Sequence, residues 1–229
     1  CGCSRYSYQS SSSPSTAGVD FSSPVSYTCF VMFTVDQKFP NFTLEAYFPG
    51  RDELGRLSSS DFAGTWLILF WYPKDFTFVC PTELADLNTR CDEFKKLGVE
   101  VVSVSTDTVY THKGWIEAEQ LITGLKYPMA ADHNGRLAKE LGIYEEESGV
   151  AQRAAFIIDP DGVLRAADIV SDSIGRSAGE ILRKVKALKF VRDHPGKVCP
   201  ASWDEGQPIL SPSIKIAGKV HGEIVKMAL

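Results

Sequence analysis

The chain has 229 residues, of which 44% are hydrophobic and 23% charged, and its formal net charge is −5. This composition is typical of a globular protein, and without a basic run it argues against nucleic acid and anionic membranes as partners. The apolar run TWLILFWY has the length of a buried strand and falls far short of the roughly 18 residues that a membrane span needs.

Residues 1–29 differ from the rest of the chain. They are rich in Ser and carry only Arg5 and Asp20 as charges, which makes them too polar for a secretory signal. We expect a disordered extension, and a cloning remnant or reading-frame artefact would look the same. A residual transit segment and a lipid-modified Cys1 are the alternatives.

From about residue 33 the sequence alternates strand and helix patterns. A buried strand is predicted before Pro73, and the region 81–98 is predicted to be one helix that stops at Gly98. Its apolar stripe recurs at spacings of three or four residues: Leu84, Leu87, Cys91 and Phe94.

Further elements follow in the same order. The patterns predict a strand at 99–107, a helix at 108–121, a short strand at 127–132, a short helix at 134–143, two strands within 154–170 and a helix at 177–193. The last helix has the apolar stripe Ile181, Val185, Leu188 and Val191, and the turn between the two strands is Asp159-Pro160-Asp161-Gly162. Such alternation predicts an α/β sandwich with a mixed sheet. After Pro195 the chain becomes an arm, long enough that we expect it to pack on something.

The cysteines are Cys1, Cys3, Cys29, Cys80, Cys91 and Cys199. Their wide spacing does not suggest a disulfide scaffold, and the missing Cys-x-x-Cys argues against a zinc ribbon or a thioredoxin-type redox pair. The histidines show no ligand spacing, so we expect no metal site. We interpret Cys91, on the same helix face as Cys80 and three turns beyond it, as a core residue.

Cys80 stands where a buried strand gives way to a predicted helix. Only the thiolate is nucleophilic, and the free N–H groups of a helix N-terminus stabilise it. Pro81 suits the first helical turn because it has no N–H to leave unpaired. Thr77, three residues before Cys80, can offer a hydroxyl to whatever approaches the sulfur, and Glu83 lies three residues after it. This placement favours a reactive thiol over a cysteine that only packs.

Two motifs resemble those of a known family. The stretch PKDFTFVCPTE, with Pro73, Thr77 and Cys80, resembles the active-site signature of the peroxiredoxins, and VCPASW around Cys199 resembles the second-cysteine motif of their typical 2-Cys group. The likeness extends from about residue 33 to residue 220. It is strongest to the bacterial alkyl hydroperoxide reductase C type.

The resemblance implies a thioredoxin-like fold with a central mixed sheet flanked by helices, plus an extended C-terminal arm. Its regions would be a disordered extension (1–29), the peroxidase domain (30–193) and the arm (194–229). The implied activity is the thiol-dependent reduction of hydrogen peroxide and small organic hydroperoxides, without a metal or a bound organic cofactor.

The resemblance also assigns roles to residues. Cys80 would be the peroxidatic cysteine, which attacks the O–O bond and becomes a sulfenic acid. Thr77 would hydrogen-bond the peroxide oxygens, and Pro73 would shield the sulfur. Arg153 matches the active-site arginine of the family and would stabilise the thiolate and polarise the breaking bond. Glu83 would orient that arginine.

In the same way, Cys199 of a partner chain would be the resolving cysteine and would form an intersubunit disulfide, with the helix turn at Cys80 unwinding between the two steps. An external dithiol protein, thioredoxin or a flavoprotein disulfide reductase, would then reduce that disulfide. Family members of this type form homodimers that associate into decameric rings. We expect the same assembly here, in the cytoplasm.

The chain departs from the peroxide-sensitive members of the family, which carry a Gly-Gly-Leu-Gly segment and a C-terminal helix with Tyr-Phe. Here the corresponding loop reads LITGLKYPM and the sequence ends HGEIVKMAL. We therefore expect easy local unfolding, fast resolution by Cys199, and resistance of Cys80 to overoxidation.

Other functions stay open on the residues alone. A general disulfide exchanger is disfavoured by the missing Cys-x-x-Cys, and a papain-like hydrolase would need a His poised beside Cys80. A holdase or a peroxide-signalling partner, active as the assembled ring, is compatible with the peroxidase. His112 and Trp115, on the helix predicted at 108–121, either border the active site or pack in the core.

Overall fold

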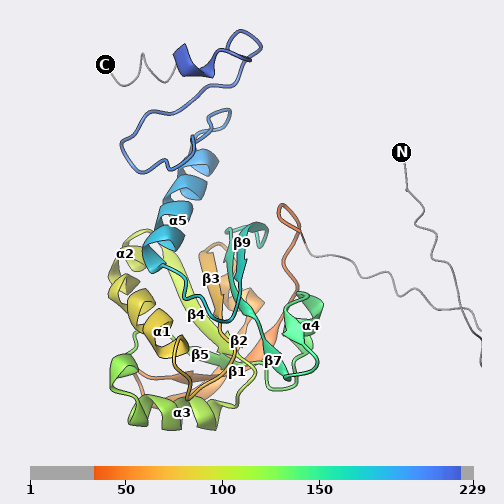
Figure 1. Cartoon of the computed structure of the whole chain (residues 1–229), viewed down its shortest axis with the longest axis vertical. Coiled ribbons are helices and arrows are strands. Elements are labelled where there is room, and N and C mark those ends of the chain that lie inside the picture. The colour runs from red at the N-terminus through yellow and green to blue at the C-terminus, as the bar shows by residue number, and fades with distance from the viewer. Residues whose placement is uncertain (1–33, 223–229) are drawn as a thin grey trace, which may run out of the picture. The chain divides into compact units, whose positions relative to one another are not determined.

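The computed structural model describes residues 34–222, so the predicted extension 1–29 lies outside the described residues. The described residues form one compact unit, built on a mixed seven-stranded sheet of order β2-β1-β5-β4-β3-β8-β9 (Figure 1). The strands are β1 (Thr43–Phe48), β2 (Glu53–Ser58), β3 (Trp66–Trp71), β4 (Val99–Ser105), β5 (Met129–Ala131), β8 (Arg153–Ile158) and β9 (Leu164–Val170). Neighbours β3, β4 and β5 run parallel, and the other pairs are antiparallel. The predicted mixed α/β sheet is confirmed.

Helices cover both faces of this sheet. They are α1 (Cys80–Thr89), α2 (Cys91–Lys96), α3 (Val109–Ala118), α4 (Arg136–Glu140) and α5 (Ala178–Asp193), with short 3₁₀ turns η1 (Ser59–Phe62) and η2 (Gln120–Ile122). In Figure 1, α1, α2 and α5 lie together on one side of the sheet and α4 lies on the other. A small separate hairpin, β6 (Tyr144–Glu145) and β7 (Val150–Ala151), precedes β8.

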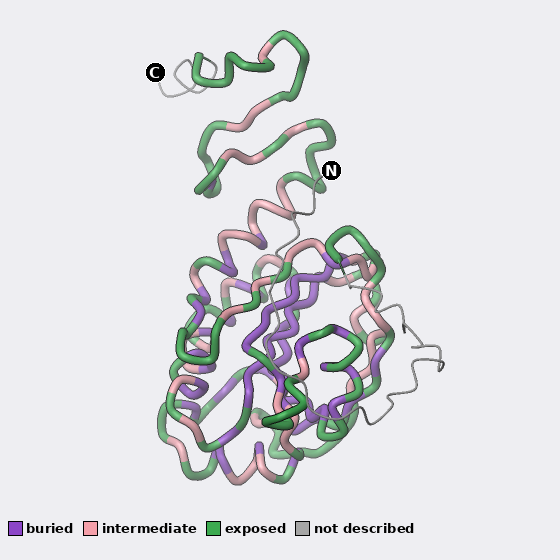
Figure 2. Tube along the Cα trace, turned by 45° about the vertical axis from the view of Figure 1, so that its right-hand side comes forward, coloured by how far each residue is buried: buried purple, intermediate pink, exposed green. Residues whose placement is uncertain are grey.

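The central strand β3 is buried along its whole length because both faces of the sheet are covered. Alternate side chains enter two apolar clusters. Trp66, Ile68 and Phe70 pack with the helices α1, α2, α3 and α5, whereas Leu67, Leu69 and Trp71 pack with α4 and β8. Figure 2 shows these buried strands in purple at the centre of the unit.

Three predictions about the elements need correction. The single helix expected at 81–98 is wrong, because the chain kinks at Arg90 (φ −99°, ψ 0°), which ends α1 and begins α2. Cys91 therefore starts a second helix, although it lies in the same apolar cluster as Cys80 and its predicted burial is confirmed. The final stripe also ends early, since Val191 is exposed. The hairpin β1–β2 was not predicted, because the residues of β2 are largely exposed and lack an apolar alternation.

The C-terminal arm packs on α5. Trp203 is buried against Phe190, with ring centroids 5.0 Å apart, and Arg183 donates through Nη1 to the Trp203 carbonyl at 2.9 Å. A β-bridge between Val198 and Leu210 closes the first loop of the arm. The expectation that the arm packs on something is confirmed for this first part, whereas residues 211–222 are largely exposed. Within residues 34–222, none of the helices has the length and apolarity that a bilayer crossing requires.

Candidate active site

Cys80 is the first residue of α1, directly after the loop that follows β3. Its side chain is fully buried. Pro81 occupies the first turn of the helix, as predicted, and the N–H groups of Thr82 and Glu83 turn back to the Val79 carbonyl. The sulfur is thus held at the N-terminal end of a helix, where the backbone dipoles favour a negative charge.

Arg153 brings a positive charge to this sulfur from the start of β8, 73 residues along the chain. Its Nη1 lies 3.2 Å from the Cys80 Sγ and 2.8 Å from Oε2 of Glu83. Burial alone would lower the pKa of Arg153, but the hydrogen bond and charge of Cys80, and then those of Glu83, outweigh it and raise the pKa above its ordinary value. The structure therefore brings together three of the predicted site residues as a buried, charge-assisted cluster.

A second buried arginine, Arg176, joins the cluster and was not predicted. Its Nε and its backbone N–H both donate to Oε1 of Glu83 at 2.8 Å, while Nη2 donates to the Trp71 carbonyl at 2.8 Å. Its guanidinium also lies over the Phe70 ring, 3.7 Å from the centroid. Burial lowers the pKa of Arg176, although the hydrogen bond and charge of Glu83 oppose this. In the sequence, Arg176 is marked only by its place between Gly175 and Ser177, the N-cap of α5, and this is a weak signal of a functional residue.

The loop between β3 and α1 carries the other predicted residues. Pro73 is buried and Thr77 is half-buried. The Thr77 hydroxyl donates to the Lys74 carbonyl at 2.9 Å. While that bond holds, the hydroxyl oxygen can only accept a hydrogen bond from an incoming molecule.

A buried polar network fixes the middle of this loop to α3. The Asp75 carboxylate accepts from the Tyr72 hydroxyl at 2.7 Å and lies 2.7 Å from Nδ1 of His112. The other ring nitrogen of His112 lies 3.2 Å from the Ala130 carbonyl. Trp115 is also buried and packs against Tyr72. His112 and Trp115 therefore hold the loop in place through their contacts with Asp75 and Tyr72.

Cys199 lies on the arm, half-buried against α5. Its Sγ is 3.9 Å from the Ala187 carbonyl. Burial raises the pKa of this thiol, and the charge of Arg183 partly offsets the effect. The hydrogen bonds that fix this part of the arm come from α5 and from the arm itself, so one chain does not bring Cys199 into the Cys80 cluster. Cys80, Cys91 and Cys199 are all free thiols.

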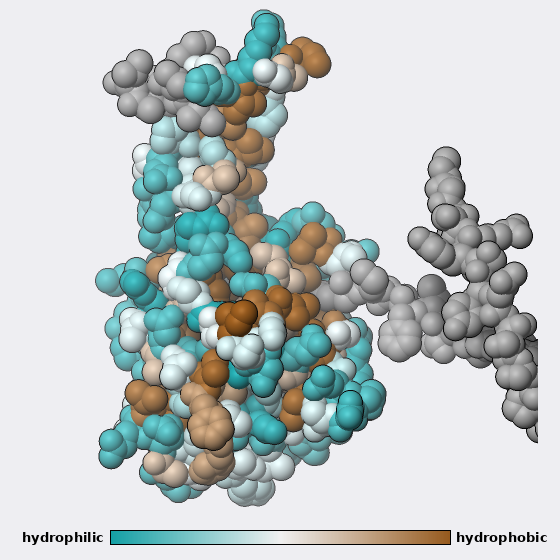
Figure 3. Space-filling model, viewed as in Figure 1, coloured by the Kyte–Doolittle hydropathy of each residue, from teal (hydrophilic) through white to brown (hydrophobic). Residues whose placement is uncertain are grey.

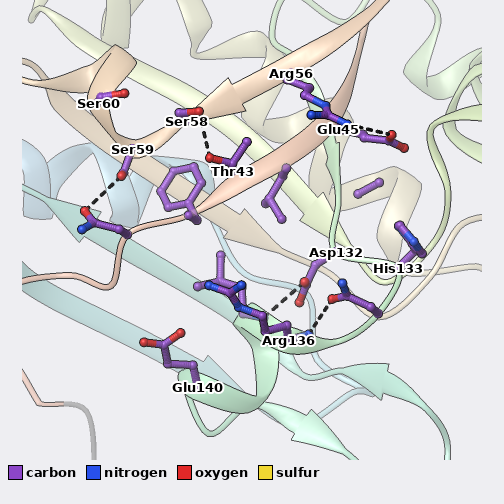
Figure 4. Close-up of a pocket in the computed structure, with 16 residues that line it drawn as sticks. Thr43, Glu45, Arg56, Ser58, Ser59, Ser60, Asp132, His133, Arg136 and Glu140 are labelled. Carbon is purple, nitrogen blue, oxygen red and sulfur yellow. Dashed lines mark hydrogen bonds and ion pairs between the residues drawn. The ribbon is translucent and has the colours of Figure 1, made fainter.

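A cavity of about 720 Å³ lies in another part of the unit. It lies between β1, β2 and α4, and none of the predicted site residues lines it. Figure 4 shows its mixed polar lining, in which Arg56 pairs with Glu45 and the Thr43 and Ser58 hydroxyls meet at 3.0 Å. The cavity combines both signs of charge and adds nothing to the chemistry of the thiol.

Large apolar side chains are exposed near the Cys80 loop. Phe78 is 92% exposed and Phe76 is 58% exposed, and Tyr110 on α3 is 73% exposed. The Phe76 ring is tilted toward Trp115, with centroids 6.2 Å apart. Figure 3 shows that hydrophobic side chains also gather on the face of the unit below α5 in that view.

Comparisons with known proteins agree with this geometry. A model of the AhpC/TSA family matches residues 35–167. Alkyl hydroperoxide reductase C of Staphylococcus epidermidis (strain ATCC 12228 / FDA PCI 1200) is 45% identical over 189 residues, which span 82% of this chain and 100% of that protein. The corresponding protein of Staphylococcus aureus (strain N315) is 42% identical over the same length.

Solved structures give the same result. The crystal structure of Enterococcus faecalis AhpC has a TM-score of 0.69 and 46% identity, over 72% of this chain and 98% of that one. Reduced Plasmodium vivax 2-Cys peroxiredoxin has a TM-score of 0.77 and 32% identity, over 82% and 98%. These matches confirm the thioredoxin-like fold. The chain belongs to the AhpC/TSA family, as a thiol-dependent peroxidase of the 2-Cys peroxiredoxin type.

Proposed function

We propose that Cys80 is the peroxidatic cysteine and that it reduces hydrogen peroxide and small organic hydroperoxides. The observation that carries this proposal is the 3.2 Å contact between Arg153 Nη1 and the Cys80 Sγ, at the start of a helix. The Cys80 thiolate attacks one peroxide oxygen, the O–O bond breaks, and the leaving oxygen takes a proton to become water or an alcohol. Cys80 is thereby oxidised to a sulfenic acid.

The residues around Cys80 stabilise charge, bind the peroxide and shield the sulfur. Arg153 stabilises the thiolate and then the negative charge that develops on the leaving oxygen. Glu83, with its carboxylate buried between Arg153 and Arg176, orients the guanidinium. Thr77 accepts a hydrogen bond from the peroxide, and Pro73 shields the sulfur from bulk water.

Cys199 of a second copy of the chain is proposed to resolve the sulfenic acid. Its thiolate attacks the sulfur of Cys80, a disulfide forms, and the sulfenic oxygen leaves as water. The free Cys199 thiol, held on its own α5, supports a role toward another chain. The α1 turn at Cys80 unwinds for this step, and an external dithiol protein, thioredoxin or a flavoprotein disulfide reductase, then reduces the disulfide.

The same cycle needs more than one chain, and we propose a homodimer that assembles into a decameric ring. Strand β9 ends the sheet, and within residues 34–222 its outer edge has no strand partner, so it can pair with a second copy. The exposed aromatic side chains of Phe76, Phe78 and Tyr110 offer a second contact surface. A cytoplasmic location suits free thiols that a dithiol reductant must regenerate.

The test is non-reducing electrophoresis and intact mass after one equivalent of hydrogen peroxide, on the wild type, Cys80→Ser and Cys199→Ser. We expect a disulfide-linked dimer in the wild type only. A dimer that persists in Cys199→Ser would assign resolution to another thiol. A fully reduced wild type that does not react would reject the role of Cys80.

A further inference from the structure

Arg153 is held from two opposite sides, and only one of them is the buried Glu83. On the other side its Nε donates to the Asp172 carbonyl at 2.7 Å, and its Nη2 lies 3.0 Å from the Asp172 carboxylate. The planar guanidinium is therefore fixed at both ends of its N–H fork. The Nη1 group between these anchors is the one that reaches Cys80.

Asp172 lies in the short loop 171–176 that joins β9 to α5. The far end of this loop carries Arg176, whose backbone N–H and Nε hold the opposite oxygen of Glu83. Gly175 brings the loop against the start of α1, since a Cβ at this position would lie 3.3 Å from Cγ1 of Val79. One loop thus supplies Arg176, holds Arg153 through Asp172 and packs against Val79, the residue before Cys80.

We infer that Asp172 is a positioning residue for Arg153, a role that rests on the proposed function of Cys80 and Arg153. Nη1 is shared between Cys80 and Glu83, and Glu83 is the closer partner. Without the carboxylate on Nη2, only the Asp172 carbonyl on Nε restrains this edge, and the guanidinium can turn toward Glu83 and away from the sulfur. The second anchor keeps Nη1 directed at the thiolate.

The two anchors differ in strength because they differ in burial. The Glu83 side chain is 1% exposed, whereas the Asp172 side chain is 80% exposed. Water screens an exposed ion pair, so its loss changes an equilibrium or a rate by about fivefold at most. Asp172 therefore adjusts the alignment of Arg153, while Glu83 is needed to keep it buried.

Positioning and simple charge predict opposite results when Asp172 is changed. If its carboxylate acted only as a negative charge near the sulfur, its removal would favour the thiolate, and the pH midpoint for alkylation of Cys80 would fall. If it aligns Arg153, its removal weakens the Nη1 contact. The midpoint then rises and the peroxide reaction slows.

The experiment compares Asp172→Ala, Asp172→Asn and Asp172→Glu with the wild type. Stopped-flow measurement gives the rate constant with hydrogen peroxide, and iodoacetamide alkylation across pH gives the midpoint of Cys80. We expect a rate about threefold to fivefold lower in Asp172→Ala, with a raised midpoint. Asp172→Asn, which keeps an oxygen acceptor, and Asp172→Glu, which keeps the charge, should each recover part of the loss.

The matched control is Asp161→Asn, which removes another exposed carboxylate paired with an arginine, Arg192, at 2.8 Å. It should leave both readouts unchanged. An unchanged rate or a lowered midpoint in folded Asp172→Ala, with a reactive wild type, would overturn the role of Asp172 alone. A wild-type Cys80 that does not react with peroxide would overturn the proposed function itself.

Discussion

Cys80 and Cys91 are both buried, yet their surroundings differ in charge. Cys80 begins α1 with the Arg153 guanidinium 3.2 Å from its sulfur. Cys91 begins α2 and faces the Leu87 carbonyl at 3.6 Å, and burial raises its pKa to about 11. Burial by itself favours the protonated thiol, and a fixed cation is what distinguishes the site that we propose to be reactive.

The largest effect is expected on stability, when the Glu83 carboxylate that pairs with Arg153 is removed. Glu83→Gln leaves two buried guanidinium groups, those of Arg153 and Arg176, without the buried carboxylate that they share. We expect the free energy of unfolding to fall by about 3–5 kcal/mol, measured by urea denaturation. Glu180→Gln is the control, since it breaks an exposed pair with Arg183 and should cost less than about 1 kcal/mol. A similar cost for both variants would contradict the picture of a buried charge cluster.

Removal of the cation tests the reactive thiol directly. Arg153→Met should lower the rate constant of Cys80 with hydrogen peroxide by about 10²–10³-fold, because a preorganised donor to the developing charge is lost. Stopped-flow kinetics on the fully reduced protein gives this value. Arg192→Met, which removes an arginine paired with Asp159 and Asp161, should react like the wild type. A loss of less than about threefold in Arg153→Met would make the arginine structural only.

The raised pKa of Cys91 predicts how the stability of the protein changes at alkaline pH. The pKa of Cys91 is raised from 9.0 to about 11 in the folded protein, so the thiol ionises first in the unfolded chain. Its contribution to stability is complete below about pH 9 and is lost as the pH rises to about 11, by about 2 kcal/mol. Cys91→Ala should remove this part of the alkaline loss when unfolding is measured at both pH values. An identical alkaline loss in both proteins would show that Cys91 is not the group responsible.

The smallest effect is expected for the activity of the same variant. Cys91→Ala should react with peroxide within about twofold of the wild type. Cys91 lies outside the charge cluster, and a substitution away from the reacting groups has a small effect. The same stopped-flow assay measures it. A large loss would mean that Cys91 shares the chemistry of Cys80.

How much of this site could be predicted depended on local signals. The position of Cys80 at a strand-to-helix junction follows from the sequence around it, and Pro81 confirms the helix start. The motif resemblance added Arg153, Pro73 and Cys199. The contact between Arg153 and Cys80 could not be worked out from spacing, because β8 reaches β3 only through the order of strands in the sheet.

Other features carry no local signal at all. Arg176 and Asp172 are isolated polar residues in a loop without periodicity, and only the packing of that loop on α1 reveals their contacts. The kink at Arg90 was missed because the apolar stripe of α1 continues into α2 across it. The exposed strand β2 was missed because it presents no apolar face. Core elements were predictable where burial shaped the pattern, and surface elements were not.

The most direct test of the difference between the two thiols is the site of first oxidation. The Cys199→Ser variant, in which the sulfenic acid cannot be resolved by that residue, is treated with one equivalent of hydrogen peroxide in the presence of dimedone and analysed by peptide mass spectrometry. We expect a dimedone adduct on Cys80 and none on Cys91. An adduct on Cys91, or a reduced protein that gives no adduct, would contradict the assignment of Cys80 as the peroxide-reactive thiol.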